Sequence, residues 1–422
     1  MSVKAANAEA LRRLGEAQPV LVDCRPAAEA LSLEAGTVLH AGPPIAWDAM
    51  CPMLQGAVVG ALRHEGWAVT DGEAARMAAR GDVRFEPCHH RGAVGPMTGL
   101  ITPSMPVFVV EERTFGARAA VTINEGLGRV LRFGASDAPV LERLAWLRDE
   151  AGPLLGRTLR RLGGLELRPL MGQALWMGDE MHQRNVAASS LFVRALLPAL
   201  VREAAGPALA RLVDFIAGND QFFLNLAMAA AKAAAEPALA VPRASVVATM
   251  ARNGTEFGIR VGGCGSRWFT APVNTPDGLF FPGFGPPDAN PDIGDSAIVE
   301  TVGLGGMAMA ASPAVARFVG AGGLAEALRI TDEMREITLG EHPHFRIPAQ
   351  QDRGAPLGID VRRVVATGIT PLINTGIAGR KPGTGQVGAG VVRAPLGCFT
   401  AALEALATRL AGDTEAGGAV DA

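Results

Sequence analysis

Residues 244–263, ASVVATMARNGTEFGIRVGG, mark a change in the texture of this 422-residue chain. Two runs with apolar and β-branched residues flank Asn253-Gly254, and an Asn-Gly pair between such runs predicts a β-hairpin. Residues 140–240, by contrast, are rich in alanine and leucine and are expected to be largely helical. The chain therefore combines helical and strand-rich regions, and we expect a multi-domain α/β protein.

Five segments are expected along the chain. Apolar runs at 19–24 and 107–110 predict strands, while 186–203 and 220–236 have the apolar spacing of helices. The expected organisation is a small N-terminal Rossmann-like parallel-sheet unit (1–85), a loop and strand segment joining the core (86–140), a helical insert (141–240), a mixed α+β core with glycine-rich loops (241–412) and a frayed tail (413–422).

Composition excludes several classes of protein. Hydrophobic residues make up 49% of the chain, which excludes a disordered protein. The net charge of −3 argues against a dedicated nucleic-acid-binding protein, which would carry an excess of basic residues. The longest uncharged run, 92–110, contains three prolines, so no membrane span is expected. No signal peptide is visible, and the five cysteines are scattered without a CxxC pair. We therefore expect a cytoplasmic protein without a disulfide framework.

The hairpin carries the first candidate site. Arg252 and Arg260 have planar guanidinium groups, which can bind a carboxylate or phosphate through two parallel hydrogen bonds. Asn253 and Thr255 add neutral hydrogen-bond donors. The two arginines share one face of the hairpin if the turn leaves the register unchanged. We predict that Arg252 is catalytic and that the other three bind substrate or phosphate. The alternative is a hairpin with polar residues at a solvated tip.

Histidines form two further candidates. In GDEMHQRN (178–185), His182 is a candidate proton donor or carbonyl polariser, oriented by the carboxylate of Asp179. An ion-pair network at a helix start explains the same residues equally well. In PCHHR (87–91), we predict that His89 is catalytic and that His90 binds substrate. A third ligand at zinc spacing is missing, so no metal is predicted.

Two loops add candidate binding residues. Asp288 and Asn290 lie in FGPPDANPDIGDS (284–296) and offer oxygen atoms to a hard cation or a substrate amide, or else form Asx turns. Residues 374–390 are expected to form a glycine-rich loop that follows a strand. The backbone N–H groups of such a loop can approach an anion closely. That segment matches neither Walker A nor GxGxxG, and it can instead be a packing surface. Its candidates are Asn374, Thr375, Gly376, Gly385 and Gln386.

Blocks of this sequence resemble the bacterial YlbE/AllG family. The resemblance covers about residues 15 to 405. It rests on GDEMHQRNVAAS, GNDQFFLNLAMAAAK, TMARNGTEFGIRV, DANPDIGDSAIVETVGLGGMAMAASP and INTGIAGRKPGTGQVGAGVVRAP, with VLVDCRPA, LHAGPPI, PCHHRGAVGPMTG and NEGLGRVLRFG upstream. One departure is Gly379-Arg380-Lys381, where the family pattern has His-Lys after Ala378.

The resemblance implies a component of oxamate carbamoyltransferase in purine (allantoin) catabolism. The implied reaction is phosphorolysis of oxalurate, or of a related ureido acid, to oxamate and carbamoyl phosphate, and it needs no cofactor. The implied partners are FdrA-like and AllH-like subunits in a heteromeric complex, and a homo-oligomer is compatible with the sequence. Two alternatives are a non-catalytic scaffold subunit of that complex and a stand-alone ureido or amide hydrolase.

Overall fold

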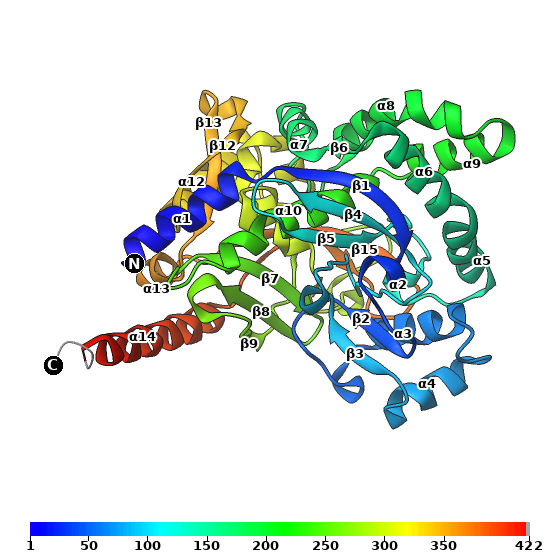
Figure 1. The fold of residues 1–422 in the computed structure, drawn as a ribbon, viewed down its shortest axis with the longest axis horizontal. Helices are drawn as coiled ribbons and strands as arrows, with labels where there is room; N and C mark the ends of the chain where they lie inside the picture. The colour runs from blue at the N-terminus through cyan, green and yellow to red at the C-terminus, as the bar shows by residue number, and fades with distance from the viewer. Residues whose placement is uncertain (419–422) are drawn as a thin grey trace.

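The structure, a computed structural model, describes residues 1–418 as a mixed α/β protein (Figure 1). Helices α5, α6, α8 and α9 gather at one end, and the small sheets are spread across the molecule, from β12 and β13 at the other end to β2 and β3 below α5. The helices are α1 (Val3–Glu16), α2 (Ala27–Ala30), α3 (Pro52–His64), α4 (Asp71–Arg80), α5 (Ala138–Trp146), α6 (Gly152–Leu162), α7 (Leu167–Trp176), α8 (Val186–Glu203), α9 (Gly206–Ala217), α10 (Phe222–Leu239), α11 (Pro313–Phe318), α12 (Leu324–Glu336), α13 (Val361–Thr367) and α14 (Leu396–Gly418).

The strands form five small sheets, ordered β5-β4-β1-β6, β2-β3, β11-β7-β8-β9, β10-β15-β14 and β12-β13. Their bounds are β1 (Pro19–Pro26), β2 (Thr37–His40), β3 (Arg84–Pro87), β4 (Pro106–Glu112), β5 (Arg118–Thr122), β6 (Leu165–Glu166), β7 (Val247–Asn253), β8 (Glu256–Val261), β9 (Phe269–Pro272), β10 (Asp277–Phe280), β11 (Ile293–Gly294), β12 (Thr338–Ile347), β13 (Arg353–Ile359), β14 (Leu372–Ala378) and β15 (Gln386–Arg393). Except for the β2–β3 pair, all of these pairings are antiparallel.

The predicted Rossmann-like unit at the N-terminus is not confirmed. Among the described residues, parallel pairing of strands is limited to β2 and β3, which are joined through α3 and α4. Strand β1 pairs antiparallel with β4 and β6 instead, and its Leu21 and Cys24 side chains pack into the larger core. The first strand of the chain thus belongs to a sheet whose other strands come from beyond residue 100.

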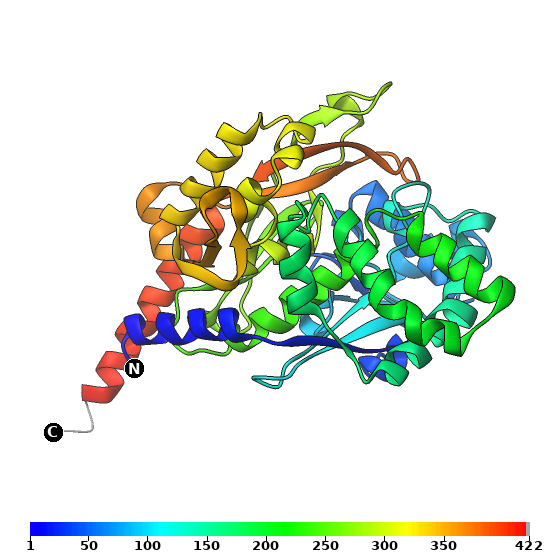
Figure 2. The ribbon, with the colours of Figure 1, turned by 90° about the horizontal axis from the view of Figure 1, so that it is seen from above.

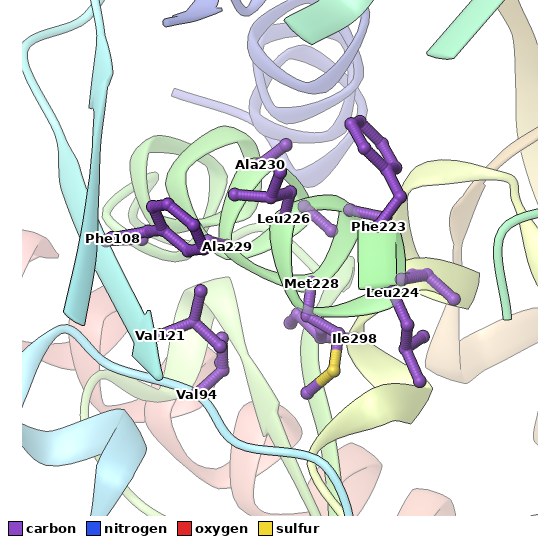
Figure 3. Packing of buried hydrophobic residues seen from close by; sticks show 14 of the residues in the cluster. Val94, Phe108, Val121, Phe223, Leu224, Leu226, Met228, Ala229, Ala230 and Ile298 are labelled. Carbon is purple, nitrogen blue, oxygen red and sulfur yellow. The ribbon is translucent and has the colours of Figure 1, made fainter. Parts of the chain in front are cut away.

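Helix α10 occupies the centre of the larger core. A helix that is apolar on all sides is expected to be buried, and every α10 residue except Glu236 is buried. Figure 3 shows Phe223, Leu226 and Met228 of α10 among side chains from β4, β5 and the 3₁₀ helix η7 (Ser296–Val302). One charged side chain, Lys232, is carried into this core, and its Nζ pairs with Glu236 one turn later.

The predicted hairpin at 244–263 is confirmed as β7 and β8. Helix α1 packs beside it through a pair of hydrogen bonds: the Asn7 amide donates to Ser245 Oγ at 2.8 Å and accepts from Ser245 N at 2.8 Å. Figure 2 places the start of α1 and the end of α14 at the same end of the molecule. Helix α14 extends through Gly418, within the expected tail of 413–422, and 419–422 lie outside the described residues.

Within residues 1–418, the helices are either too short or too polar to cross a membrane.

Candidate active site

Arg252 is buried and all of its donors are occupied. Its Nε and Nη2 bind the two carboxylate oxygens of Asp292 at 2.7 and 3.0 Å. Nη1 donates to the carbonyl oxygen of Gly294 at 2.9 Å and to Ser296 Oγ at 3.3 Å. Thr375 Oγ1 completes the group by donating to Asp292 at 2.9 Å. The guanidinium group predicted to bind substrate therefore binds groups of the protein itself. Its hydrogen bonds connect β7 to the β11 segment and, through Asp292, to Thr375 of β14.

The other two hairpin-tip candidates also have structural partners. Asn253 Oδ1 accepts hydrogen bonds from the backbone N–H groups of Thr255 and Glu256, at 3.0 and 2.7 Å, which closes the turn at Gly254. The Asn253 amide donates to the carbonyl of Pro43 at 3.1 Å, and Thr255 Oγ1 donates to that of Ala49 at 2.9 Å. The tip is thus docked on the 43–49 segment, with Asn253 buried and Thr255 exposed.

The register of the hairpin separates the two arginines. Thr249 lies opposite Arg260, and Arg252 lies opposite Phe257. Arg260 and Phe257 are three residues apart, so their side chains leave opposite faces of the sheet. The condition for a shared face is not met, because the two-residue turn at Gly254-Thr255 sets the pairing. Arg252 and Arg260 consequently belong to two different sites.

Arg260 lies with both predicted histidines of the 87–91 segment. The guanidinium carbon is 5.8 Å from the ring centre of Trp268, and the same indole contacts His89 edge-on at 5.7 Å. His89 Nε2 is 3.4 Å from Asp295 Oδ1, and Trp268 Nε1 donates to His90 Nε2 at 2.8 Å. Burial lowers the pKa of His89 and His90, and in both the charge of Arg260 lowers it further. The structure thus brings together three of the predicted residues.

His182 is paired with a carboxylate that the sequence did not indicate. Its Nδ1 is 2.7 Å from Glu300 Oε1, which also accepts from the backbone N–H groups of Gly306 at 3.1 Å and Asn374 at 3.2 Å. Gly305 has a φ of +59°, and a Cβ there would lie 2.1 Å from Glu300 Oε1. Glycine is therefore required for the carboxylate to sit against His182.

Asp179 does not orient His182, which corrects the sequence prediction. Its Oδ2 accepts from Ala188 N at 2.8 Å, within the first turn of α8, and its Oδ1 is 3.3 Å from Arg184 Nε. The reason is a tight turn over 179–185, closed by Glu180, whose carboxylate accepts from three successive backbone N–H groups at 2.6 to 2.9 Å. Burial raises the pKa of Glu180 to about 7.

The remaining candidates divide between strands, turns and a cavity. Asn374, Thr375 and Gly376 lie in strand β14 and not in a loop, so much of the predicted loop is a β-hairpin. Asp288 Oδ2 accepts from Gly285 N at 2.9 Å, and the Asn290 amide donates to the carbonyl of Pro291 at 2.7 Å, as in local turns. Gly385, with a φ of +87°, lies in the turn before β15.

A cavity of about 330 Å³ opens beside the His182 segment. Gln386 lines the cavity, and so do three other residues with carboxamide side chains: Gln183, Asn185 and Gln221. Asn185 Nδ2 donates to Gln221 Oε1 at 3.1 Å and reaches the carbonyl of His182 at 3.4 Å. Gln386 is thus the candidate from the glycine-rich segment that faces open space near the histidine.

Sequence reasoning missed Glu300, Asp295, Lys232, His40 and Trp268. Two of them carried a signal: Glu300 is the single charge in 296–312, and Lys232 is the single charge in 221–235. A charge placed in an apolar run is costly unless it has a partner. Among the described residues, no group of three or more His, Cys, Asp or Glu side chains could hold a metal ion.

Comparisons with known proteins agree with one another. The family model described as "Oxamate carbamoyltransferase subunit AllG" matches residues 83–296. Oxamate carbamoyltransferase subunit AllG of Escherichia coli (strain K12) is 52% identical over 410 residues, which cover 96% of this chain and 98% of that protein. The uncharacterized protein YahG of the same organism is 44% identical over 95% of this chain and 85% of its own length. A crystal structure of a conserved protein of unknown function from Enterococcus faecalis V583 superposes with a TM-score of 0.94 at 44% identity, covering 96% of this chain and 98% of that one.

Proposed function

This chain belongs to the AllG family, and we propose that it is a component of a carbamoyltransferase that works with FdrA-like and AllH-like subunits. The proposed reaction is phosphorolysis of oxalurate, or of a related ureido acid, to oxamate and carbamoyl phosphate. Support for the transferase comes from the E. coli relative, which is named as a subunit of oxamate carbamoyltransferase. Support for a site in this chain comes from the His182 region.

One observation supports our proposal that the carbamoyl group binds beside His182. Three buried oxygen atoms around His182 accept no hydrogen bond: Glu300 Oε2, Asn374 Oδ1 and Asn185 Oδ1. Buried acceptors without donors are costly, so a ligand with several N–H groups is favoured there. A ureido group presents N–H donors and one carbonyl oxygen. The acceptors suit its nitrogen atoms, and His182 suits its oxygen or its leaving nitrogen.

The chemistry follows from this arrangement. A phosphate oxygen attacks the ureido carbonyl carbon, and negative charge develops on the carbonyl oxygen in the tetrahedral intermediate. The C–N bond to the oxamate nitrogen then breaks, and that nitrogen takes up a proton while phosphate loses one. A histidine held by a carboxylate is suited to carry this proton. We assign that role to His182, with Glu300 as the residue that positions its ring.

The test is carbamoyl phosphate formation by the chain together with its two partners. We expect product from oxalurate only when phosphate is present, and a loss of turnover by about 10²- to 10⁴-fold in His182→Asn, the usual contribution of an acid–base group. His344→Asn, which changes an exposed histidine, is the matched control and should keep full activity.

Other outcomes would select the alternatives. Phosphate-independent release of ammonia would favour a stand-alone hydrolase. A complex that forms normally and retains full activity with His182→Asn and Glu300→Gln would indicate a scaffold subunit whose catalytic groups lie in a partner. No product from a panel of ureido acids, with all partners supplied, would sink the enzyme proposal.

A further inference from the structure

A groove of about 420 Å³ lies along one face of helix α7, beside β12 (Figure 1). Arg168, Gly172 and Trp176 follow one another at intervals of four residues, so they share this face of the helix. Gly172 leaves the middle of the face without a side chain. The backbone of β12 forms the opposite wall, because a Cβ at Gly172 would lie 3.4 Å from the carbonyl oxygen of His344. We call this feature the α7 groove.

The α7 groove ends in apolar side chains that the chain itself leaves exposed. Trp176 is 57% exposed, and the next residue, Met177, is 52% exposed. The other four tryptophans of the chain are buried or half-buried. Tryptophan, arginine and methionine are enriched where proteins contact one another, whereas small-molecule sites enclose most of their ligand. An open groove of this composition is typical of a protein contact.

The charge beside the α7 groove is positive. Within residues 1–418, Arg168 and Arg346 form no ion pair, and their guanidinium groups donate to backbone carbonyl oxygens. The six residues that line the groove include no acidic residue. Burial lowers the pKa of the neighbouring His342 to about 3, and the charges of His344, Arg168 and Arg346 lower it further without an opposing carboxylate. The groove therefore suits a partner that carries negative charge.

A second copy of this chain does not fit that requirement. In a two-fold contact the same surface meets itself, so Arg168 and Arg346 would face their own copies across the groove. Like charges that face one another across an interface cost affinity, and acidic residues that could offset them are missing from the lining. A different chain with acidic side chains is attracted by the same two arginines. The E. coli relative is named as a subunit, which is in keeping with a different partner chain.

We propose that the α7 groove binds a segment of a partner subunit that carries acidic side chains beside an apolar one. The apolar side chain fills the space over Gly172 and packs on Trp176, and the acidic side chains meet Arg168 and Arg346. The existence of a partner subunit rests on the proposed function, whereas the position of the contact rests on the groove.

The α7 groove lies next to the segment that carries the candidate acid–base group. Trp176 is the last residue of α7, and the backbone N–H of Asp179 still donates to the carbonyl oxygen of Ala174 at 3.0 Å. The tight turn over 179–185, which holds His182, begins at that point. A partner in the groove therefore binds at the border of the candidate active site.

Docking can be measured with the full chain and the purified FdrA-like and AllH-like subunits, each added alone, by sedimentation velocity. We expect one of the two subunits to form a complex with the chain. The affinity should fall at least tenfold between about 50 and 500 mM sodium chloride, because salt screens the attraction between opposite charges.

Gly172→Gln is the most direct variant, since its side chain fills the groove. Glutamine is a better helix former than glycine, and the nearest atom would be 3.4 Å from the new Cβ, so the fold is kept. We expect docking to weaken at least tenfold with an unchanged circular dichroism spectrum. The matched control is Gly72→Gln, at an exposed glycine of α4 whose added Cβ would also have its nearest neighbour at 3.4 Å. It should dock as the unmodified chain does.

Two further variants separate the apolar contact from the charge. Trp176→Ala and Arg346→Glu should each weaken docking at least tenfold, and Arg346→Glu should also reduce its dependence on salt. Leu324→Ala, at a position that is 46% exposed on α12, is the control for the first. Arg76→Glu, at an exposed arginine of α4, is the control for the second. Both controls should dock normally.

The results distinguish this surface from the proposed reaction. Undiminished docking by Gly172→Gln and Trp176→Ala would overturn the groove, as would the failure of both subunits to bind the unmodified chain. Self-association of the chain alone that Gly172→Gln abolishes would place a second copy in the groove and overturn the acidic partner. A complex that needs the groove but makes no carbamoyl phosphate would keep the surface and sink the reaction. Turnover without docking at the groove would do the reverse.

Discussion

The two faces of the β7–β8 hairpin each carry a buried arginine, and the two arginines differ in how they are hydrogen-bonded. On one face, Arg252 is fully buried and makes hydrogen bonds through Nε, Nη1 and Nη2, with a bidentate contact to Asp292. On the other face, Arg260 is almost as buried and makes none with the described residues. The residue type, the strand pair and the degree of burial are nearly the same. The difference lies in which donors the protein itself uses.

This contrast separates an arginine whose hydrogen bonds hold the fold together from one that makes no such bonds. A buried ion pair with complete hydrogen bonding is held for its contribution to the fold, and breaking it leaves an uncompensated charge. Arg260 has no ion pair of this kind, and the charge of Glu236 acts on it without a hydrogen bond. We therefore expect substitution of Arg252 to lower the free energy of unfolding far more than substitution of Arg260.

The largest effect should come from Arg252→Met. The substitution leaves the buried carboxylate of Asp292 without its ion-pair partner, so we expect the free energy of unfolding in urea to fall by about 3–5 kcal/mol. Asp292→Leu in the same chain should restore part of that loss, because it removes the stranded charge. If Arg252→Met were as stable as the unmodified chain, the proposed distinction between the two faces would be wrong.

A second test asks whether backbone N–H groups can stabilise a buried carboxylate, that of Glu180, as well as an ion pair does. Glu180 accepts three backbone N–H groups, yet burial raises its pKa from 4.5 to about 7. The folded state holds this proton more tightly, so the contribution of Glu180 to stability is most favourable below pH 4.5 and declines as pH rises to 7. The decline amounts to about 3 kcal/mol at 1.4 kcal/mol per unit.

Glu180→Gln should remove this part of the pH dependence. The measurement is the free energy of unfolding between pH 4.5 and pH 8, compared with the unmodified chain. Glu404→Gln, at an exposed position of α14, is the matched control and should leave the profile unchanged. Parallel profiles for the Glu180 variant and the unmodified chain would show that its three hydrogen bonds fully compensate for burial.

The smallest change in stability should come from Arg260→Met. Removing a buried charge that holds no ion pair, while keeping an apolar side chain of similar length, should leave the free energy of unfolding within about 1 kcal/mol of the original, or raise it. The measurement is urea unfolding. A loss comparable to that of Arg252→Met would show that Arg260 has a structural partner and would erase the contrast between the faces.

Local patterns in the sequence predicted local structure well. The Asn-Gly pair placed the hairpin, and the apolar spacing of 186–203 placed α8 at the bounds that the structure has. Those features depend on residues close together in the chain, where turn chemistry and helical periodicity apply. The N-terminal sheet was harder to predict, since β1 pairs with residues 80 to 93 positions away and its apolar run does not reveal the direction of its partner.

The candidate sites depend on longer separations still. His182 and Glu300 are 118 residues apart, and nothing in either local segment indicates their contact. Asp179, the carboxylate nearest in sequence, seemed the natural partner, but the tight turn directs it to the N-terminus of α8. The sequence could indicate that Glu300 and Lys232 need partners, because each is a lone charge in an apolar run. It could not indicate which partners the fold supplies.

The hydrogen bonds between α1 and Ser245, just before β7, also bear on how the protein is made. Asn7 and Ser245 are 238 residues apart, so at 5–20 residues per second the ribosome needs roughly 12 to 48 seconds to supply the partner of α1. Its packing partners α10, β12 and β13 are likewise made more than 200 residues after it, and until then the buried side chains of α1, among them Ala6, Ala10 and Leu14, lack these contacts. The first helix to leave the ribosome can therefore complete its packing only after more than half of the chain has been made.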